Sequence, residues 1–194
     1  FDLTSSTGRF AASHPELKRP IYRYQIGKVW RYDRPAAGRY REFYQADADI
    51  IGSYSMDCEV DLLLLATTVL KEFGLHDYRF VLNHRKILEA QLRRAGIPVD
   101  KKADALRALD KFDKIGREAM ITEAKNYGID ESSFVAFIEQ LGISADSTGA
   151  SGNLAYLERT EALLADDPDG KKATVELRYI VERATELGFA DRLT

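Results

Sequence analysis

The stretch VWRYDRPAAGRYREFYQ, residues 29–45, predicts the tip of a long antiparallel β-hairpin. Residues rich in β-branched and aromatic side chains lie on both sides of a short segment that carries Pro35 and Gly38, which are common in turns. We therefore expect one strand over Ile21–Asp33 and a second over Arg39–Ile51. The first ~55 residues as a whole have a strand-like composition.

Side chains alternate between the two faces of a strand, so each predicted strand divides into two sets. One set on the second strand is mostly apolar and aromatic: Tyr40, Glu42, Tyr44, Ala46, Ala48 and Ile50. The other set is almost entirely polar: Arg39, Arg41, Phe43, Gln45, Asp47 and Asp49. The polar set of the first strand is Arg23, Gln25, Gly27, Arg31 and Asp33.

The polar face has two interpretations. A solvated sheet surface explains the charges, whereas a substrate cleft also explains the aromatic ring of Phe43 and the small residues interleaved along the strands. Arginine binds phosphate or carboxylate groups bidentately, an aromatic ring stacks on a purine, and Asp with Gln can bind an ammonium group. The face therefore suits an anionic nucleotide beside a small zwitterion.

Beyond residue 56 the pattern becomes helical. We expect a helix over Asp57–Phe73 that stops at Gly74, a short strand over Tyr78–Leu82, and a helix over His84–Ala95 with Asn83 as its N-cap. From Asp100 onward we expect amphipathic helices with turns at Gly116, Gly128, Gly142 and Gly170, and a loop or turn over Ser147–Gly152.

Composition restricts the class of protein. The chain has 194 residues, of which 45% are hydrophobic and 30% charged, so it can bury a globular core. A net charge of −3 argues against a basic protein that coats nucleic acid, although eight Lys or Arg residues and a single acid lie between Lys18 and Arg41. The longest apolar run, Leu62–Ala66, is too short to span a membrane.

The cysteine and the histidines do not indicate a reactive or metal site. A single cysteine, Cys58, excludes an intrachain disulfide and favours a reducing compartment, and its place in an apolar helix favours a core position over a nucleophile. The three histidines, His14, His76 and His84, have no metal-ligand spacing, so no metal site is expected.

The run from residue 29 to Gly52 resembles motif 2 of the class II aminoacyl-tRNA synthetases in its histidyl form. Asp2-Leu3-Thr4 followed by Arg9 is similar to the family's upstream histidine-binding segment, although Ser5–Gly8 replaces its usual Val-Pro-x-Ala. Residues 82–88 resemble the start of the histidyl insertion domain, and residues 187–193 resemble the segment before the family's second histidine signature. Nearly the whole chain is covered, with a looser match in its helical middle.

The resemblance implies a role for each matching residue. Arg31 would be the catalytic arginine, which neutralises the α-phosphate and the histidine carboxylate. Asp33, which stands where the family often has Glu, would lie near the adenine amino group, Arg39 would reach the terminal phosphates, and Phe43 would stack on adenine. The histidine-binding residues would be Asp2, Thr4, Gln45 and Asp49. The implied cofactors are ATP and Mg²⁺, since adenylate formation needs positioning and charge neutralisation more than a proton-transfer group.

The resemblance also implies an α+β fold, in which part of a class II antiparallel sheet precedes a mostly helical insertion domain. Residues 1–83 would belong to the catalytic domain, 84–186 to the insertion domain, and 187–194 to the return toward the catalytic domain. Motif 1, motif 3 and the anticodon-binding domain find no match, so we expect a fragment with little or no activity alone. The parent would be a cytoplasmic homodimer; the state of the fragment is left open because motif 1 is absent.

The resemblance further implies that the parent binds histidine, ATP and the acceptor stem of tRNA(His), with no membrane partner. Arg85, Lys86, Arg93 and Arg94 could contact acceptor-stem phosphates, or they could form an exposed helix face. Two other functions stay open. The first is a synthetase-like regulatory subunit of ATP phosphoribosyltransferase, against which the long helical module counts. The second is a synthetase-like sensor domain of a kinase. The presence of Arg31, Gln45 and Asp49 together counts against it, because a non-catalytic relative need not keep all three.

Overall fold

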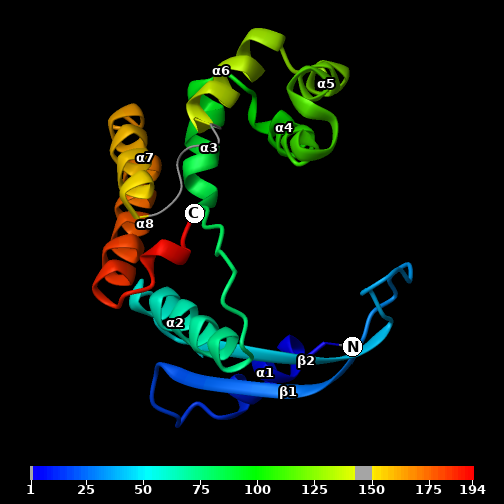
Figure 1. The fold of residues 1–194 in the computed structure, drawn as a ribbon, viewed down its shortest axis with the longest axis vertical. Helices are drawn as coiled ribbons and strands as arrows, with labels where there is room; N and C mark the ends of the chain where they lie inside the picture. The colour runs from blue at the N-terminus through cyan, green and yellow to red at the C-terminus, as the bar shows by residue number, and fades with distance from the viewer. Residues whose placement is uncertain (1, 143–149) are drawn as a thin grey trace. The chain divides into compact units, whose positions relative to one another are not determined.

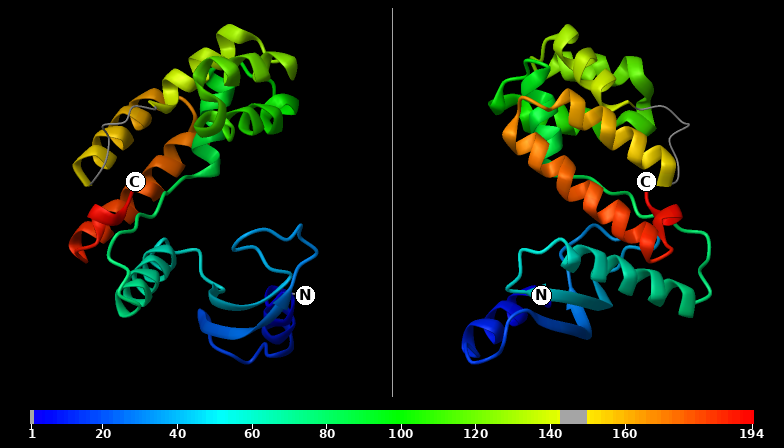
Figure 2. Two further views of the ribbon diagram at one scale, coloured as in Figure 1. Left: turned by 45° about the vertical axis from the view of Figure 1, so that its right-hand side comes forward. Right: turned by 90° about the vertical axis from the view of Figure 1, so that its left-hand side faces the viewer.

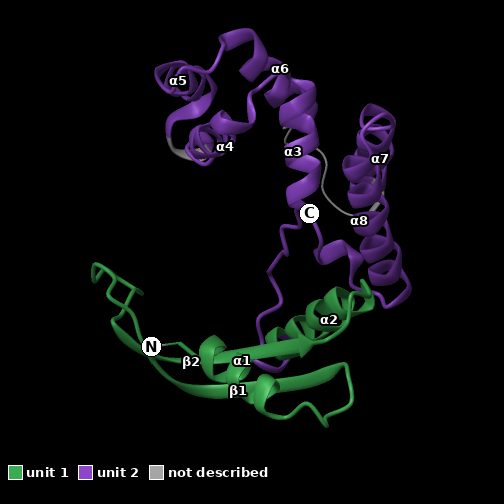
Figure 3. Ribbon diagram, turned by 180° about the vertical axis from the view of Figure 1, so that it is seen from behind, with its two compact units in different colours: residues 1–70 green, residues 71–194 purple. Residues whose placement is uncertain are grey.

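The computed structural model describes residues 2–142 and 150–194, and the fold is α+β. The chain forms two compact units, residues 1–70 and residues 71–194, which Figure 3 colours separately. Residues 147–149 of the expected loop lie outside the described residues, whereas Ala150–Gly152 begin a helix.

Unit 1 contains the predicted hairpin (Figure 1). Strand β1 covers Ile21–Trp30 and pairs antiparallel with β2, which covers Glu42–Ile51. Both strands are about three residues shorter at the tip than the sequence predicts, although Arg31 still donates its backbone N–H to the carbonyl of Arg41 at 2.9 Å. The predicted helix forms as α2, Asp57–Glu72, and it is followed by Gly74 with a φ of 73°.

The expectation that the first ~55 residues are strand-like is wrong for residues 4–13, which form helix α1, Thr4–Ser13. Leu3, Thr7 and Ala11 are spaced by four residues and are buried, so they form one stripe along this helix. The Thr7 hydroxyl also donates to the Leu3 carbonyl at 3.0 Å. The Ser- and Thr-rich sequence has little intrinsic helix propensity, so this buried stripe supplies the stability that composition does not show.

The polar face of the hairpin is the more covered of its two faces. The odd-numbered residues of β1 are half-buried or buried, and Leu3 lies over Gly27, 3.5 Å from where a Cβ would stand. The even-numbered residues of β1 are all exposed, among them Tyr24, Ile26 and Trp30. Polarity therefore does not identify the outer face of this sheet.

Unit 2 consists mainly of helices (Figure 2). The described residues of these helices pack around two clusters of buried side chains. The elements are α3 (Arg85–Arg94), η1 (Val99–Lys101), α4 (Lys102–Leu109), α5 (Phe112–Asn126), α6 (Glu131–Leu141), α7 (Ala150–Leu163), α8 (Pro168–Glu186) and η2 (Ala190–Arg192). The larger cluster joins α3, α4, α5 and α6 around Phe134 and Phe137, which are fully buried. The smaller cluster joins α3 and α8 through Ala90, Leu164 and Ala173.

Glycine positions in unit 2 follow the prediction in three cases of four. Gly116 interrupts α5 with a φ of 75°, and Gly128 and Gly142 end helices with positive φ. Gly170 is not a turn residue, because it lies in the first turn of α8. A Cβ there would stand 2.9 Å from the Cβ of Ala90, so glycine permits the close approach of α8 to α3.

The segments that begin and end unit 2 are joined by a short parallel backbone pairing. The predicted strand Tyr78–Leu82 appears only as an isolated bridge between Phe80 and Leu193. Phe80 donates to the carbonyl of Arg192 at 2.7 Å, and Leu82 donates to the carbonyl of Thr194 at 2.8 Å. Because the partner lies more than a hundred residues away, local composition could not reveal this pairing.

The sequence predicts Asn83 as the N-cap of α3, whereas in the structure the N-cap is His84. Its Nδ1 accepts the backbone N–H of Lys86 at 3.2 Å, while its Nε2 lies 2.9 Å from Glu176 on α8. A neutral imidazole can accept at one nitrogen and donate at the other, so His84 caps one helix and links it to a second.

The N-cap of α8, Asp167, has a pH-dependent contribution to stability. Its carboxylate accepts the backbone N–H of Gly170 at 2.9 Å and pairs with Arg93 at 2.7 Å. The Gly170 hydrogen bond, followed by the Arg93 contact, lowers the pKa of Asp167 below its ordinary value. A carboxyl group whose pKa is lowered on folding stabilises the fold above its unfolded pKa, and it loses this effect as the pH falls through the folded pKa.

We expect Asp167→Ala to lower the free energy of unfolding by about 1 kcal/mol at pH 7, the usual value for an N-cap. The difference from the wild type should persist down to about pH 4 and shrink at lower pH. Urea unfolding at several pH values measures it, with the exposed neighbour Asp166→Ala as the matched control. Equal effects of the two substitutions, or a difference that persists unchanged at pH 2, would contradict the assignment.

Candidate functional site

The hairpin register decides which polar side chains meet. In β1 and β2, Arg23 lies opposite Asp49, Gly27 opposite Gln45, and Val29 opposite Phe43. The strands are joined by a tight turn in which Ala36 and Arg39 exchange backbone hydrogen bonds of 3.2 and 3.0 Å. Gly38, at the third position of this turn, has a φ of 73°, which a type II turn requires. The predicted alternation of faces is therefore present along both strands.

At the tip of the hairpin, Asp33 and Arg39 bind each other. The Arg39 Nε lies 3.1 Å from Asp33 Oδ2, and Arg41 donates from its Nε to the backbone carbonyl of Asp33 at 3.0 Å. The Arg39 side chain is 65% exposed, so solvent screens this ion pair and it contributes little to stability. Arg39 can therefore exchange Asp33 for an incoming anion at low cost.

Just beyond the end of β1, Arg31 contacts two predicted site residues. Its Nη2 donates to Gln45 Oε1 at 2.6 Å, and its guanidinium lies over the Phe43 ring at 5.1 Å from the centroid. Gln45 in turn donates from Nε2 to both carboxylate oxygens of Asp47, at 2.8 and 2.9 Å. The amide of Gln45 is thus oriented on both sides, with its oxygen toward the arginine.

At the far end of the face, Arg23 contacts three other residues. Its Nε lies 3.5 Å from Asp49 Oδ2, its Nη2 donates to Gln25 Oε1 at 2.7 Å, and its Nη1 donates to Thr7 Oγ1. The sequence places Arg23 and Asp47 on the polar face by alternation, but it predicts no role for them. The alternation of side chains along the strands is the one signal that includes Arg23 and Asp47, and it does not distinguish their roles from those of the neighbouring polar residues.

Asp2 and Thr4 lie at the start of α1, where Asp2 Oδ1 accepts the backbone N–H of Thr4 at 3.0 Å. Among residues 2–142 and 150–194, no hydrogen bond or ion pair joins them to Gln45 or Asp49. The segment reaches the hairpin instead through Leu3 over Gly27 and through Thr7 bonded to Arg23. The structure thus places three of the eight predicted residues, Phe43, Gln45 and Asp49, on the polar face of β2. Arg31, Asp33 and Arg39 lie in the connection between the strands, and Asp2 and Thr4 lie at the start of α1.

The candidate tRNA-contacting residues on α3 are largely held by acids. Arg85 pairs with Glu89 at 3.1 Å, Lys86 with Asp169 at 3.1 Å, and Arg93 with Asp167 at 2.7 Å. The three cationic side chains are all more than 40% exposed, and ion pairs of exposed cations are weak. A phosphate could therefore compete for the same cations.

Cys58 is half-buried on α2.

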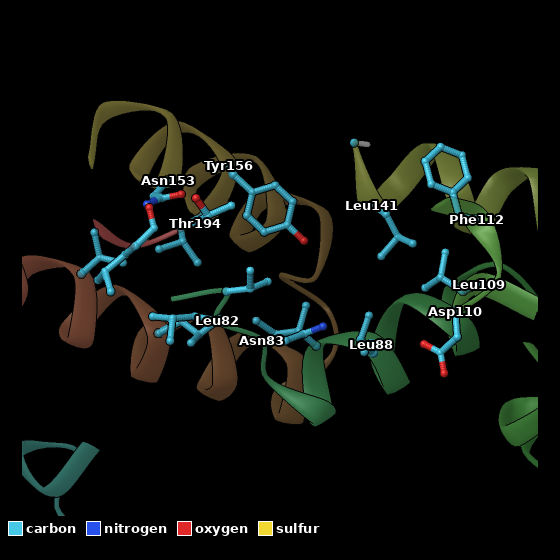
Figure 4. Close-up of a pocket in the computed structure, with 17 residues that line it drawn as sticks. Leu82, Asn83, Leu88, Leu109, Asp110, Phe112, Leu141, Asn153, Tyr156 and Thr194 are labelled. Carbon is cyan, nitrogen blue, oxygen red and sulfur yellow. The ribbon is translucent and has the colours of Figure 1, made fainter. Parts of the chain in front are cut away.

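Unit 2 also contains an apolar cavity of about 700 Å³, which the sequence did not predict. Figure 4 shows Leu88, Leu109, Leu141, Phe112 and Tyr156 at its wall, with Asn153 near the C-terminal Thr194. Asn153 is occupied within the fold, because its Nδ2 donates to the carbonyl of Leu193 at 2.9 Å. No helix in the described part of the chain is long and apolar enough to cross a membrane.

Comparison with solved structures identifies the fold. The crystal structure of histidyl-tRNA synthetase from Nostoc sp. PCC 7120 superposes with a TM-score of 0.85 at 22% identity, over 100% of this chain and 44% of that one. An ATP phosphoribosyltransferase regulatory subunit/histidyl-tRNA synthetase from Bacillus halodurans superposes with a TM-score of 0.76 at 19% identity, over 99% of this chain and 47% of that one. The fold is therefore one found in synthetase structures, and the fold alone does not separate an enzyme from a regulator.

Sequence comparison is more specific. The family model described as histidyl-tRNA synthetase matches residues 1–194. The histidine–tRNA ligase of Flavobacterium johnsoniae is 36% identical over 98% of this chain, which spans 39% of that relative. The chain belongs to the histidyl-tRNA synthetase family. It spans about two fifths of the length of the curated relatives it matches, 39% in this case.

Proposed function

We propose that the polar hairpin face is the ATP- and histidine-binding part of a histidine–tRNA ligase. The observation that carries the proposal is the chain of contacts from Phe43 through Arg31 and Gln45 to Asp47. An aromatic ring, a hydrogen-bonded cation and an oriented amide thus stand in one row, an arrangement that suits an anionic nucleotide beside an amino acid. Membership in the family supports the same assignment.

The reaction assigned to this face is formation of histidyl-adenylate. A carboxylate oxygen of histidine attacks the α-phosphorus of ATP, the bond to the bridging oxygen breaks, and pyrophosphate leaves with its electron pair. Arg31 would neutralise charge on the α-phosphate and the carboxylate, while Arg39 would bind the terminal phosphates. Phe43 would stack on adenine, with Asp33 near its amino group. Gln45, Asp49, Asp2 and Thr4 would bind the histidine.

Two occupied contacts must open for this binding. The Arg31 guanidinium lies over the Phe43 ring at 5.1 Å, so an adenine ring would take its place there. Arg39 would likewise release Asp33, 3.1 Å away, and this would free the carboxylate for the adenine amino group. Arg31 and Arg39 are both exposed, so solvent can replace these contacts at low cost.

Mg²⁺ would enter with the nucleotide. In the part of the chain that the structure describes, no group of three or more His, Cys, Asp and Glu residues is placed to hold a metal ion. Mg²⁺ usually keeps several waters and binds through one or two carboxylates and the phosphates of its substrate. When bound, it supplies charge neutralisation at the phosphates. The arginines of this chain add to that neutralisation without replacing it.

The proposed partners follow from the same assignment. The whole protein would transfer histidine to tRNA(His) in the cytoplasm, as a homodimer, and α3 of unit 2 would contact the acceptor stem through Arg85, Lys86, Arg93 and Arg94. Residues 84–186 would form the insertion domain, between a catalytic segment over 1–83 and its continuation over 187–194.

Histidine-dependent exchange of pyrophosphate into ATP, measured on the full-length protein, tests the assignment. We expect exchange with histidine and not with the other amino acids, followed by charging of tRNA(His). The alternative is a regulatory subunit of ATP phosphoribosyltransferase, one of the two names that the similar Bacillus halodurans structure carries. Absence of exchange together with stimulation of ATP phosphoribosyltransferase would establish that alternative and overturn ours.

A further inference from the structure

Arg23 is the most enclosed cation on the hairpin, with a side chain that is only 14% exposed. Its three nitrogens have separate partners, each on a different element. The Nε faces Asp49 on β2, the Nη2 donates to Gln25 on β1, and the Nη1 donates to Thr7 on α1. A guanidinium can do this because its donors diverge in one rigid plane.

The contact with Thr7 extends to the start of the chain. The Thr7 hydroxyl accepts from Arg23 and donates to the carbonyl of Leu3 at 3.0 Å. Leu3 lies between Asp2 and Thr4, and its own side chain rests on Gly27 of β1. One row of contacts therefore joins Asp49 on β2, through Arg23 and Thr7, to the Asp2–Thr4 segment.

The contact with Asp49 leaves that carboxylate available. Arg23 approaches one oxygen, Oδ2, while the Asp49 side chain remains 38% exposed. A carboxylate has about four acceptor positions, of which Arg23 occupies one. Asp49 is thus oriented from within the fold and still accessible to a ligand.

We propose that Arg23 is a positioning residue for the amino-acid half of the site, which holds Asp49 and the Asp2–Thr4 segment in register with each other. This proposal rests on the proposed function. It does not extend to the nucleotide half, because Arg31 contacts Phe43 and Gln45, whereas in the described part of the chain Arg23 contacts neither Arg31 nor Phe43. Replacement of Arg23 should therefore change the KM for histidine more than the KM for ATP.

The test is histidine-dependent pyrophosphate exchange on the full-length protein with Arg23→Met, which keeps the apolar stem and removes the donors. We expect the KM for histidine to rise by about tenfold or more, equivalent to about 1.4 kcal/mol per tenfold. The KM for ATP should change by less than about twofold, since the nucleotide contacts are separate. A purely structural role would reduce the amount of active enzyme and leave both KM values unchanged.

Two further variants and a control sharpen the test. Arg23→Lys should restore the histidine KM only in part, because one ammonium cannot reach all three partners in the same geometry. Thr7→Val keeps the side-chain shape and removes the hydroxyl, so it should raise the histidine KM in the same direction by a smaller factor. It also tests the idea if Arg23→Met fails to fold. Lys28→Met, on the same strand and the opposite face, is the matched control and should change neither KM.

The outcomes separate the two proposals. If the wild type shows no exchange, the proposed function fails, and calorimetric titration of histidine into wild type and Thr7→Val still tests Arg23. If the wild type is active but Arg23→Met and Thr7→Val leave the histidine KM unchanged, the positioning role is wrong and the proposed function stands. Equal increases in both KM values would also overturn it.

Discussion

Replacement of Arg31 by alanine is expected to lower kcat/KM for histidine-dependent pyrophosphate exchange by on the order of 10²–10³-fold, the effect of removing one positioned donor from a transition state. Arg31 lies just beyond the end of β1, where its Nη2 donates to Gln45 at 2.6 Å and its guanidinium covers the Phe43 ring. On the proposed function, this cation would meet both the α-phosphate and the histidine carboxylate. Its removal should then mainly lower kcat, because charge would accumulate there as the new bond forms.

The measurement is the exchange rate of the full-length protein at several histidine and ATP concentrations. Lys28→Ala is the matched control, since Lys28 is a cation on the same strand whose side chain pairs with Glu42 at 2.9 Å on the other face. Arg31→Lys should recover only part of the loss, because an ammonium cannot form the bidentate contacts of a guanidinium. If kcat/KM of Arg31→Ala were within about threefold of that of the Lys28→Ala control, the proposed role of Arg31 in the reaction would be wrong.

The second large effect concerns the stability of unit 2. Phe137→Ala is expected to lower the free energy of unfolding by about 3–5 kcal/mol, as truncation of a buried aromatic side chain usually does. Phe137 is fully buried in α6 and lies 6.2 Å, ring to ring, from Phe134, which is also fully buried. The surrounding helices α3, α4 and α5 fix the position of this cluster, so they can collapse only partly into the cavity.

Urea unfolding of this chain, followed by the helical circular dichroism signal, measures the change. Phe73→Ala is the control: Phe73 follows α2 and is 77% exposed, so its truncation should cost less than about 0.5 kcal/mol. Similar unfolding midpoints for the two variants would show that the α6 cluster is not the core of unit 2.

Several expectations are wrong because they depend on contacts between residues that are far apart in the sequence. The sequence does not predict helix α1, because its residues favour a helix only when Leu3, Thr7 and Ala11 are buried together. The composition of Tyr78–Leu82 predicts a full strand, whereas its pairing partner is residues 192–194, far along the chain. Glycine usually ends helices and so predicts a turn at Gly170, whereas in the structure Gly170 allows Ala90 to approach.

The sequence by itself determined the α+β class, the hairpin with its turn at Gly38, and the set of polar side chains that share one face. These properties are local, because strand alternation and turn geometry depend on neighbouring residues. Only the tertiary structure decided that Leu3 and Thr7 contact this polar face, that Tyr24 and Ile26 on the other face are exposed, and that Arg23 joins Asp49 to Thr7. Burial and side-chain pairing depend on which distant segments pack together, and alternation along one strand contains no information about them.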